Sequence, residues 1–290
     1  MTEEWGRIGL GVLRAAAADA PRDPGVYFFL DEIGDIIYVG KATDLRARLR
    51  QHAAAKPSTY RLHQKYDLVR RVRWERTADE EAALWREADL IFALQPPYNG
   101  DPDRRASLLG PKSPVLYIVV TEDGTGTLRF TLEANVPENG RAYGCFPHLG
   151  KGVGSDIGIA CSDGYTALLR LLWAATGEGE HIPATITRSA PLSFSVPAPA
   201  GLNGNLHRFL SGTRARLADE LLAAAAHRPP FMQPGLRADR AAALRFFAAG
   251  PKSVRAVRLR HRVRARVIDE TTYRRLVRDE IAPLVAQPQD

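Results

Sequence analysis

Residues 24–49 read PGVYFFLDEIGDIIYVGKATDLRARL and contain two short runs of β-branched and aromatic residues. The runs GVYFFL and IIYVG are separated by turn-forming residues that include Asp31, Gly34 and Asp35. This pattern predicts a β-hairpin. If Leu30 lies opposite Asp35, the antiparallel register places Tyr27 opposite Tyr38. Both phenols are then expected on one face of the hairpin.

A helix is expected directly after the hairpin, over residues 43–55. Thr43 or Asp44 is a suitable N-terminal cap, and Leu45 and Leu49 would lie on its buried face. Within this helix the buried side carries the two leucines, so the remaining positions face the rim or the solvent.

A third strand and a second helix complete this part of the chain. Residues 69–76 alternate in the manner of a strand, and a capping box from Thr77 to Glu80 precedes an apolar helical pattern that ends near Leu94. The element order β-β-α-β-α predicts a small α+β unit that ends near residue 100.

The remaining residues predict a second set of elements. Strands are expected at 115–120 and 128–132, helices at 165–175, 206–226 and 238–249, a connector within 183–204, and a strand at 257–267. The last segment alternates with period two, and one side of it carries five arginines: Arg258, Arg260, Arg262, Arg264 and Arg266.

The charge distribution favours a polyanionic partner. The chain has 40 basic and 33 acidic residues, and residues 201–290 alone carry 17 basic against 8 acidic groups. A second basic cluster lies between Lys41 and Arg76. Nucleic acid is the first candidate partner, with the five alternating arginines as candidate contacts. The acidic start is unlike a signal peptide, so a cytoplasmic, nucleoid-associated protein with no membrane contact is expected.

Glu87 is the first candidate for chemistry. Its helical neighbours three and four positions away are all apolar: Ala83, Leu84, Leu90 and Ile91. A carboxylate in an apolar stripe is costly unless a cation neutralises it, which favours a metal ion or a fixed arginine beside Glu87. A glutamate that reaches the edge of the stripe is the alternative.

The predicted helix after the hairpin orients its basic residues differently. At about 100° per residue, Arg48 and His52 border the buried face, whereas Arg46 and Arg50 point away from it. Arg48 and His52 are therefore expected beside the tyrosines, although His52 could equally be a rim histidine with a satisfied nitrogen. Arg46 and Arg50 are expected to face water or phosphate, and we count them as candidate nucleic-acid contacts.

Five separated signatures make residues 20–100 resemble the GIY-YIG nuclease family, and within it the N-terminal half of the UvrC and Cho type. They are PGVY at 24–27, YVGKA at 38–42, LRAR at 45–48, Glu87, and PYN at 97–99. Their order and spacing match the family. The resemblance implies a small three-stranded antiparallel sheet with flanking helices over 15–105. A UvrC-like, β-containing middle region over 106–200 and a basic helical region with an arginine-rich strand over 201–290 would follow.

The resemblance also implies a metal-dependent endonuclease that hydrolyses one phosphodiester of DNA. Glu87 would hold one Mg²⁺ or Mn²⁺ ion, and Arg48 would stabilise charge in the transition state. Tyr27 or Tyr38 would activate the attacking water. The pKa of a free phenol is about 10, so that tyrosine would need a lowered pKa.

Three further residues would support the reaction. Lys41 is a candidate for lowering the tyrosine pKa, together with Arg48 or the metal. Asn99 would hold the architecture of the site by hydrogen bonding, and His52 would assist.

Other functions stay open at this point. The chain could be a non-catalytic DNA-binding or repair-scaffold protein, or a nuclease that acts on RNA or foreign DNA. It lacks the cysteine cluster of UvrC, and its two cysteines are too few for an iron–sulfur cluster. We therefore expect a nuclease that makes one cut in a DNA repair setting, with DNA and a UvrB-like repair protein as candidate partners.

Overall fold

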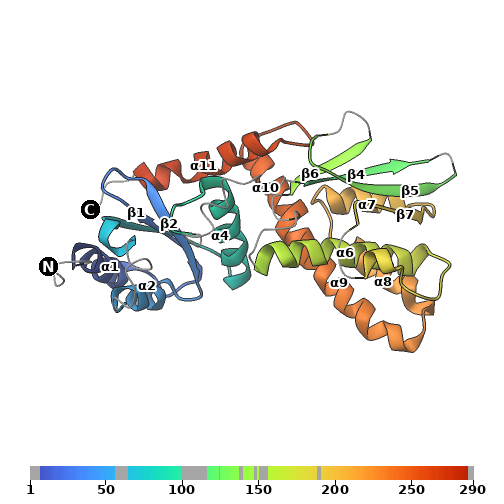
Figure 1. The fold of residues 1–290 in the computed structure, drawn as a ribbon, viewed down its shortest axis with the longest axis horizontal. Helices are drawn as coiled ribbons and strands as arrows, with labels where there is room; N and C mark the ends of the chain where they lie inside the picture. Colours follow the sequence, from blue (N-terminus) through green and yellow to red (C-terminus); the bar gives the residue numbers. More distant parts are fainter. Residues whose placement is uncertain are drawn as a thin grey trace. The chain divides into compact units, whose positions relative to one another are not determined.

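The computed structural model describes residues 7–55, 65–99, 116–123, 125–136, 140–146, 149, 156–187 and 191–286. The chain divides into two compact units. The first unit contains Met1–Lys112 and Arg274–Asp290, and the second contains Ser113–Tyr273. Figure 1 shows the elements of each unit. This grouping differs from the three consecutive regions expected from the sequence, because the end of the chain joins the first unit. Among the described helices, none is long and apolar enough to cross a membrane.

A three-stranded antiparallel sheet forms the centre of the first unit. Its strands are β1 (Gly25–Leu30), β2 (Ile36–Ala42) and β3 (Arg71–Arg76), in the order β2-β1-β3. All six residues of β1 are buried, as expected for a central strand with both faces covered. The predicted hairpin and third strand are confirmed.

The register of the hairpin differs from the prediction. Tyr27 lies opposite Gly40, and Tyr38 lies opposite Phe29, because the pairing shifts at Leu30. The Asp31 carboxylate accepts hydrogen bonds from the backbone N–H groups of Gly34 and Asp35, and Gly34 has a φ of 94°. The β1–β2 pairing is irregular between Phe29 and Leu30, next to this turn, and the pairing register therefore differs from the predicted one. The two tyrosines still share a face, with ring centroids 6.1 Å apart.

Helices cover both faces of this sheet (Figure 1). The helices α1 (Arg7–Asp19) and α2 (Leu45–Ala53) pack against each other on one side, and α4 (Glu80–Leu94) lies on the other. The core on the α1 side includes Leu13, Leu45 and Leu49, which are fully buried. The predicted α2 is confirmed, with Asp44 as its cap, whereas no element was expected at α1.

The start of α4 corrects the predicted capping box. Asp79, not Thr77, is the N-cap, because its carboxylate accepts a hydrogen bond from the Ala82 N–H at 2.7 Å. The Thr77 hydroxyl donates instead to the carbonyl of Asp79. The helix therefore begins two residues later than predicted, at Glu80.

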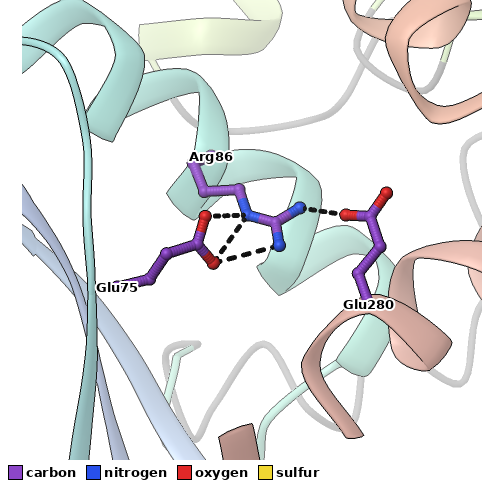
Figure 2. Close-up of polar contacts among 3 residues, drawn as sticks. All are labelled: Glu75, Arg86 and Glu280. Carbon is purple, nitrogen blue, oxygen red and sulfur yellow. Dashed lines mark hydrogen bonds and ion pairs between the residues drawn. The ribbon is translucent and has the colours of Figure 1, made fainter. Parts of the chain in front are cut away.

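The helix α11 (Glu270–Ala286) returns the end of the chain to the first unit from Arg274 onward. Figure 2 shows Arg86 of α4 between two carboxylates. Its guanidinium donates to Glu280 at 2.7 Å and to both carboxylate oxygens of Glu75 at 3.0 to 3.2 Å. The side chains of Arg86 and Glu280 are only 15% and 10% exposed, so this ion pair is shielded from solvent.

Two arginines of α11 also bind the C-terminal turn of α4. Arg274 donates to the carbonyl of Phe92 and stacks on its ring, and Arg278 donates to the carbonyl of Ala93 at 3.1 Å. The last carbonyl groups of a helix lack partners within the helix and carry partial negative charge. The two arginines therefore neutralise and cap the end of α4.

The second unit contains a four-stranded antiparallel sheet and a group of helices. The strands are β4 (Leu116–Glu122), β5 (Thr127–Glu133), β6 (Arg141–Phe146) and β7 (Ser193–Pro197), in the order β6-β4-β5-β7. The helices are α6 (Asp156–Thr176), α7 (Leu202–Leu210), α8 (Leu217–Ala224), α9 (Gln233–Phe247) and α10 (Ser253–Arg260). Short 3₁₀ turns occur at Ala184–Ile186, Ala225–His227 and Pro230–Met232, and a π-helical turn spans Ala248–Lys252. The predicted strands β4 and β5 and the helices α6 and α9 are confirmed.

Two predictions for this unit are wrong. The helix expected at 206–226 is broken after Ser211, where Gly212 has a φ of 74°. The connector expected within 183–204 leaves room for β7, which pairs with β5 and was not predicted. The arginine-rich strand expected at 257–267 is the end of α10 followed by a loop. Val254 and Val257, three residues apart, are the buried residues of α10, so a helical period decides this segment.

Candidate active site

An open hollow of about 770 Å³ in the first unit brings the predicted catalytic residues together. It lies where β1, β2, α2 and α4 meet. The five that line it are Tyr27, Tyr38, Lys41, Arg48 and Glu87. Each comes from a different position on these four elements, so the sheet and its two helices determine the arrangement.

Tyr27 reaches the hollow because its partner across the sheet is a glycine. A Cβ atom at Gly40 would lie 2.3 Å from the Tyr27 hydroxyl oxygen, which is far inside van der Waals contact. The absence of a side chain at position 40 therefore allows the phenol to lie across β2. This contact explains why a tyrosine and a glycine occur in these two strands.

A hydrogen-bonded chain runs from Tyr27 into the core. The Tyr27 hydroxyl lies 2.7 Å from Nε2 of His52, and Nδ1 of His52 lies 2.7 Å from the hydroxyl of Tyr66. His52 is buried, with 7% of its surface exposed. Burial lowers the pKa of His52 to about 3, and the nearby charges of Lys65 and Arg48 act in the same direction. His52 is thus a neutral imidazole, and it bridges two phenols.

Tyr38 has a different neighbour, although its ring lies on the same face. The Nζ atom of Lys65 lies 3.8 Å from the centre of the Tyr38 ring, a cation–π contact. Burial, with a smaller contribution from the charge of Arg48, lowers the pKa of Lys65 to about 8. A cation over the ring face stabilises electron density on the phenol.

The tyrosine pKa values do not show the expected decrease. Burial raises the pKa of both Tyr27 and Tyr38, and Arg48 opposes this effect without reversing it. Lys41 is not among the residues that shift either value. The physical reason is the enclosure of both rings by the core, which disfavours a phenolate more strongly than one exposed arginine favours it.

Glu87 is held at one oxygen by the backbone of β2. Its Oε1 accepts a hydrogen bond from the Lys41 N–H at 2.9 Å. Burial raises the pKa of Glu87, while this N–H and the charges of Lys41 and Arg48 lower it. Since the carboxylate also lines the hollow, its second oxygen is available to a ligand that enters there.

A hydrated divalent cation fits this donor set. Mg²⁺ keeps several water ligands and is often bound through only one or two carboxylates. Within the described ranges, no three side chains of His, Cys, Asp or Glu gather into a metal-binding group. A single carboxylate in an open hollow suits an ion that retains most of its hydration shell, and it does not suit a fully protein-ligated metal.

Asn99 fastens the edge strand β2. Its Oδ1 accepts from the Val39 N–H at 2.7 Å, and its Nδ2 donates to the Val39 carbonyl at 2.5 Å. The neighbouring Tyr98 N–H donates to the carbonyl of Ile37. The side chain of Asn99 therefore bonds to β2 as the backbone of a neighbouring strand would. It fixes the segment that carries Tyr38 and Lys41.

The arginines of α2 follow the expectation only in part. Arg48 is exposed, hydrogen-bonds to Gln51 at 3.0 Å and lies close enough to Tyr27 to lower the pKa of that phenol. Arg50 is exposed, whereas Arg46 donates to the carbonyl of Ala20 at 2.7 Å and is half-buried. Arg46 therefore has a structural contact in addition to its predicted role at the surface.

Tyr66 and Lys65 are the neighbours of the site that sequence reasoning missed. They lie 14 and 13 residues after His52 and belong to no signature of the hairpin or helices. An adjacent lysine and tyrosine carry no local signal of a shared site. Only the packing of α1, α2 and the sheet brings them beside His52 and Tyr38.

Comparisons with known proteins agree with this geometry. Residues 23–100 match a family model described as the UvrC-like GIY-YIG domain. UvrABC system protein C of Agrobacterium fabrum is 29% identical over 147 residues, which are 51% of this chain and 21% of that protein. The corresponding protein of Sphingopyxis alaskensis is 38% identical over 91 residues, 31% of this chain and 14% of that protein. The match spans about a fifth or less of the length of these curated relatives.

A solved structure is also similar in this region. The GIY-YIG N-terminal endonuclease domain of UvrC from Thermotoga maritima, bound to its catalytic divalent cation magnesium, is 31% identical. The similarity covers 34% of this chain and all of that chain, with a TM-score of 0.28.

The three-stranded sheet with its flanking helices corresponds to the GIY-YIG fold, and Tyr27, Tyr38, Arg48 and Glu87 lie together in its hollow. More particularly, residues 23–100 match the UvrC-like GIY-YIG domain.

Proposed function

We propose that the first unit is a metal-dependent endonuclease that hydrolyses DNA one phosphodiester at a time. The observation that carries this proposal is the shared hollow, where two phenols, a guanidinium and a carboxylate face the same space. These are the groups that a phosphodiester hydrolase needs: a path for the proton of water, a cation for the transition state and a ligand for a metal.

Glu87 would hold the divalent ion, either Mg²⁺ or Mn²⁺, through the oxygen that Lys41 does not bind. When bound, such an ion supplies neutralisation of the charge that develops on the leaving oxygen. The Lys41 N–H orients the carboxylate at 2.9 Å, so the backbone of β2 aims it into the hollow. Asn99 supports this geometry through its two bonds to Val39.

Arg48 would bind the non-bridging oxygens of the phosphate. A guanidinium at the exposed rim can contact the substrate as it enters and then stabilise the extra charge of the transition state. Arg48 and Tyr27 line the same hollow, so both would face the same phosphate.

Tyr27 would pass a proton rather than act as a preformed phenolate. A phenol with a raised pKa keeps its proton at neutral pH, but Tyr27 already contacts Nε2 of His52 at 2.7 Å. As water attacks phosphorus and one P–O bond breaks, the water proton would move to Tyr27 while the phenol proton passes to solvent in the open hollow, and the leaving oxygen would take a proton from that solvent. His52, with its low pKa, would orient the phenol without keeping the proton. Tyr38 would orient the same water or the phosphate from the neighbouring strand.

A DNA repair setting is the context that best suits this activity. The relatives named above are UvrABC system proteins, which supports DNA as the substrate and a UvrB-like protein as a partner. The excess of basic residues supports a polyanionic substrate as well. A protein of this kind would act in the cytoplasm, beside the nucleoid.

Plasmid nicking by Glu87→Gln tests the proposal. With Mg²⁺ or Mn²⁺, the wild-type protein should nick supercoiled DNA, and Glu87→Gln should lower the rate at least about 100-fold, the usual effect of removing a main electrostatic contributor. Glu81→Gln changes an exposed glutamate of the same helix and is the matched control, expected within about twofold of wild type. Parallel reactions with damaged duplex, undamaged duplex and RNA identify the substrate. Nicking by Glu87→Gln at the wild-type rate would refute the assignment.

A further inference from the structure

A second, smaller hollow lies entirely within the second unit. It measures about 260 Å³ including its open mouth and is lined by residues of β6, α10 and the segments after α7 and α10. Its apolar floor contains Phe146, Leu210 and Val254. Its polar groups include three arginines: Arg255, Arg258 and Arg266.

These arginines form a cluster of like charge. In the part of the chain that the structure describes, no carboxylate forms an ion pair with any of the three. The charges of Arg255 and Arg266 lower the pKa of Arg258, after the larger effect of burial. Arg141 and Arg208 lie close enough to act with Arg266 on the pKa of His207, beside Tyr143. The hollow is thus strongly positive on several sides.

Arg258 also has a buried donor without a partner. Its Nε atom is buried and makes no hydrogen bond among the described residues. A buried donor without an acceptor costs about 1 to 3 kcal/mol, and like charges held together add to that cost. A site that keeps both unfavourable features is suited to an anion that supplies the missing acceptor and the missing negative charge.

Phosphate is the anion whose geometry suits such a site. A guanidinium presents parallel N–H groups that match two phosphate oxygens, and it binds phosphate more specifically than an ammonium group does. The space that a water-sized sphere can occupy inside the hollow is only about 10 Å³, roughly one such sphere, so a single phosphate oxygen can enter while the rest of the phosphate stays at the mouth. An open mouth allows the rest of a polymer to remain outside.

We propose that the Arg255–Arg258–Arg266 hollow binds one backbone phosphate of the nucleic acid that the first unit cleaves. This inference rests on the proposed function for its choice of partner. The sequence predicts nucleic-acid contacts along five alternating arginines, whereas the inferred contact lies at one hollow that contains two of them, Arg258 and Arg266, together with Arg255. Because α10 is a helix, Arg258 joins Arg255 and Arg266 in the hollow, while Arg262 and Arg264 are exposed on the following loop. Phosphate contacts of this kind position a strand without reading its sequence.

The salt dependence of DNA binding tests this inference. Binding of a labelled duplex by the full chain is measured in EDTA, so that no cleavage occurs, over a range of chloride concentrations. Arg258→Gln should weaken binding about fivefold to tenfold near 0.1 M salt and reduce the slope of log K against log salt by about 1. Arg258→Lys should keep the slope of log K against log salt but lose part of the DNA affinity. Lysine keeps the positive charge but lacks the parallel N–H groups of the guanidinium.

Arg237→Gln is the matched control, since it removes an exposed arginine of α9 in the same unit. Its slope should equal that of the wild type, and thermal melting should show that all three variants are folded. Equal slopes for Arg258→Gln and Arg237→Gln, or no DNA binding by the wild type, would overturn the inference.

Two further measurements separate the causes of failure. Inorganic phosphate at matched ionic strength should displace DNA from wild type more effectively than from Arg258→Gln. If phosphate binds at Arg258 while DNA affinity does not depend on that residue, the hollow is a site for free phosphate and the inference fails. If the wild type nicks DNA but Arg258→Gln has the wild-type salt slope, only this inference is refuted. If Arg258→Gln has the reduced salt slope but the wild type does not nick DNA, only the proposed function is refuted.

Discussion

His52 combines a position beside Tyr27 with an unusual protonation state. The pKa of His52 is about 3 in the folded protein, compared with about 6.5 in an unfolded chain. Between these values the unfolded state binds a proton that the folded state excludes. Acidification therefore favours unfolding, and stability falls as the pH drops below about 6.5.

We expect His52→Gln to remove this dependence. The free energy of unfolding of the wild type should decrease by up to about 1.4 kcal/mol per pH unit between pH 6 and pH 4 through this residue alone. Denaturant unfolding at several pH values should give a shallower decrease for His52→Gln than for the wild type. His181→Gln, which changes an exposed histidine, should follow the wild-type slope. Parallel slopes for all three proteins would mean that His52 is protonated in the folded state.

Single residues of the site could be predicted from the sequence where local spacing determines them. Arg48 and Glu87 are placed by helical periodicity, and the tyrosines by strand alternation, so all four reach one hollow. The shared face of Tyr27 and Tyr38 was predicted even though their exact pairing was not. The protonation behaviour of the phenols could not be predicted, because it depends on how fully the helices α1 and α2 enclose them.

Between elements, the contact of α11 with α4 is the feature with the largest expected effect on stability. Arg86 is shared by Glu75 and Glu280 (Figure 2), and its pair with Glu280 is shielded from solvent, whereas the side chain of Glu75 is 36% exposed. Removing the cation leaves two carboxylates without the positive charge that they share. Removing one carboxylate leaves Arg86 still paired with the other.

The two substitutions should therefore differ in cost. Arg86→Met should reduce the free energy of unfolding of the first unit by about 3 to 5 kcal/mol, and Glu280→Gln by about 1 kcal/mol, because the amide oxygen still accepts a hydrogen bond. Arg216→Met breaks an exposed pair with Glu220 and should change stability by less than about 0.5 kcal/mol. Chemical denaturation measures all three. Equal costs for Arg86→Met and Glu280→Gln would contradict the shared-cation explanation.

Elements whose apolar residues follow one spacing, that of a helix or that of a strand, were predictable. Elements whose apolar residues fit both spacings were not. The segment around Arg258 alternates like a strand and also places Val254 and Val257 on one helical face. Burial of that face selects the helix, and burial depends on residues far away in the chain. The division of 206–226 into two helices likewise depends on the positive φ of Gly212, which composition alone does not reveal.

For the molecule as a whole, the number of candidate active sites determines whether the expected DNA product is nicked or linear. In the described residues, one hollow holds two tyrosines, an arginine and a carboxylate together. A hydrolytic site of this kind acts on one phosphodiester at a time. A monomeric preparation with Mg²⁺ or Mn²⁺ should convert supercoiled plasmid to open circles before any linear form accumulates, as followed by gel electrophoresis. Direct conversion to linear DNA at low enzyme concentration would require a second active site.

The docking of α11 on α4 also affects the order in which the protein is made. Phe92 and Arg274, which meet in the folded protein, are separated by 182 residues. At about 5 to 20 residues per second, a ribosome needs roughly 9 to 36 s to synthesise that interval. During this time the helix that carries Glu87 exists in the nascent chain without Arg274, Arg278 or Glu280. The first unit therefore becomes complete only after the whole second unit has been translated, so the contacts that cap α4 and pair Arg86 with Glu280 form late.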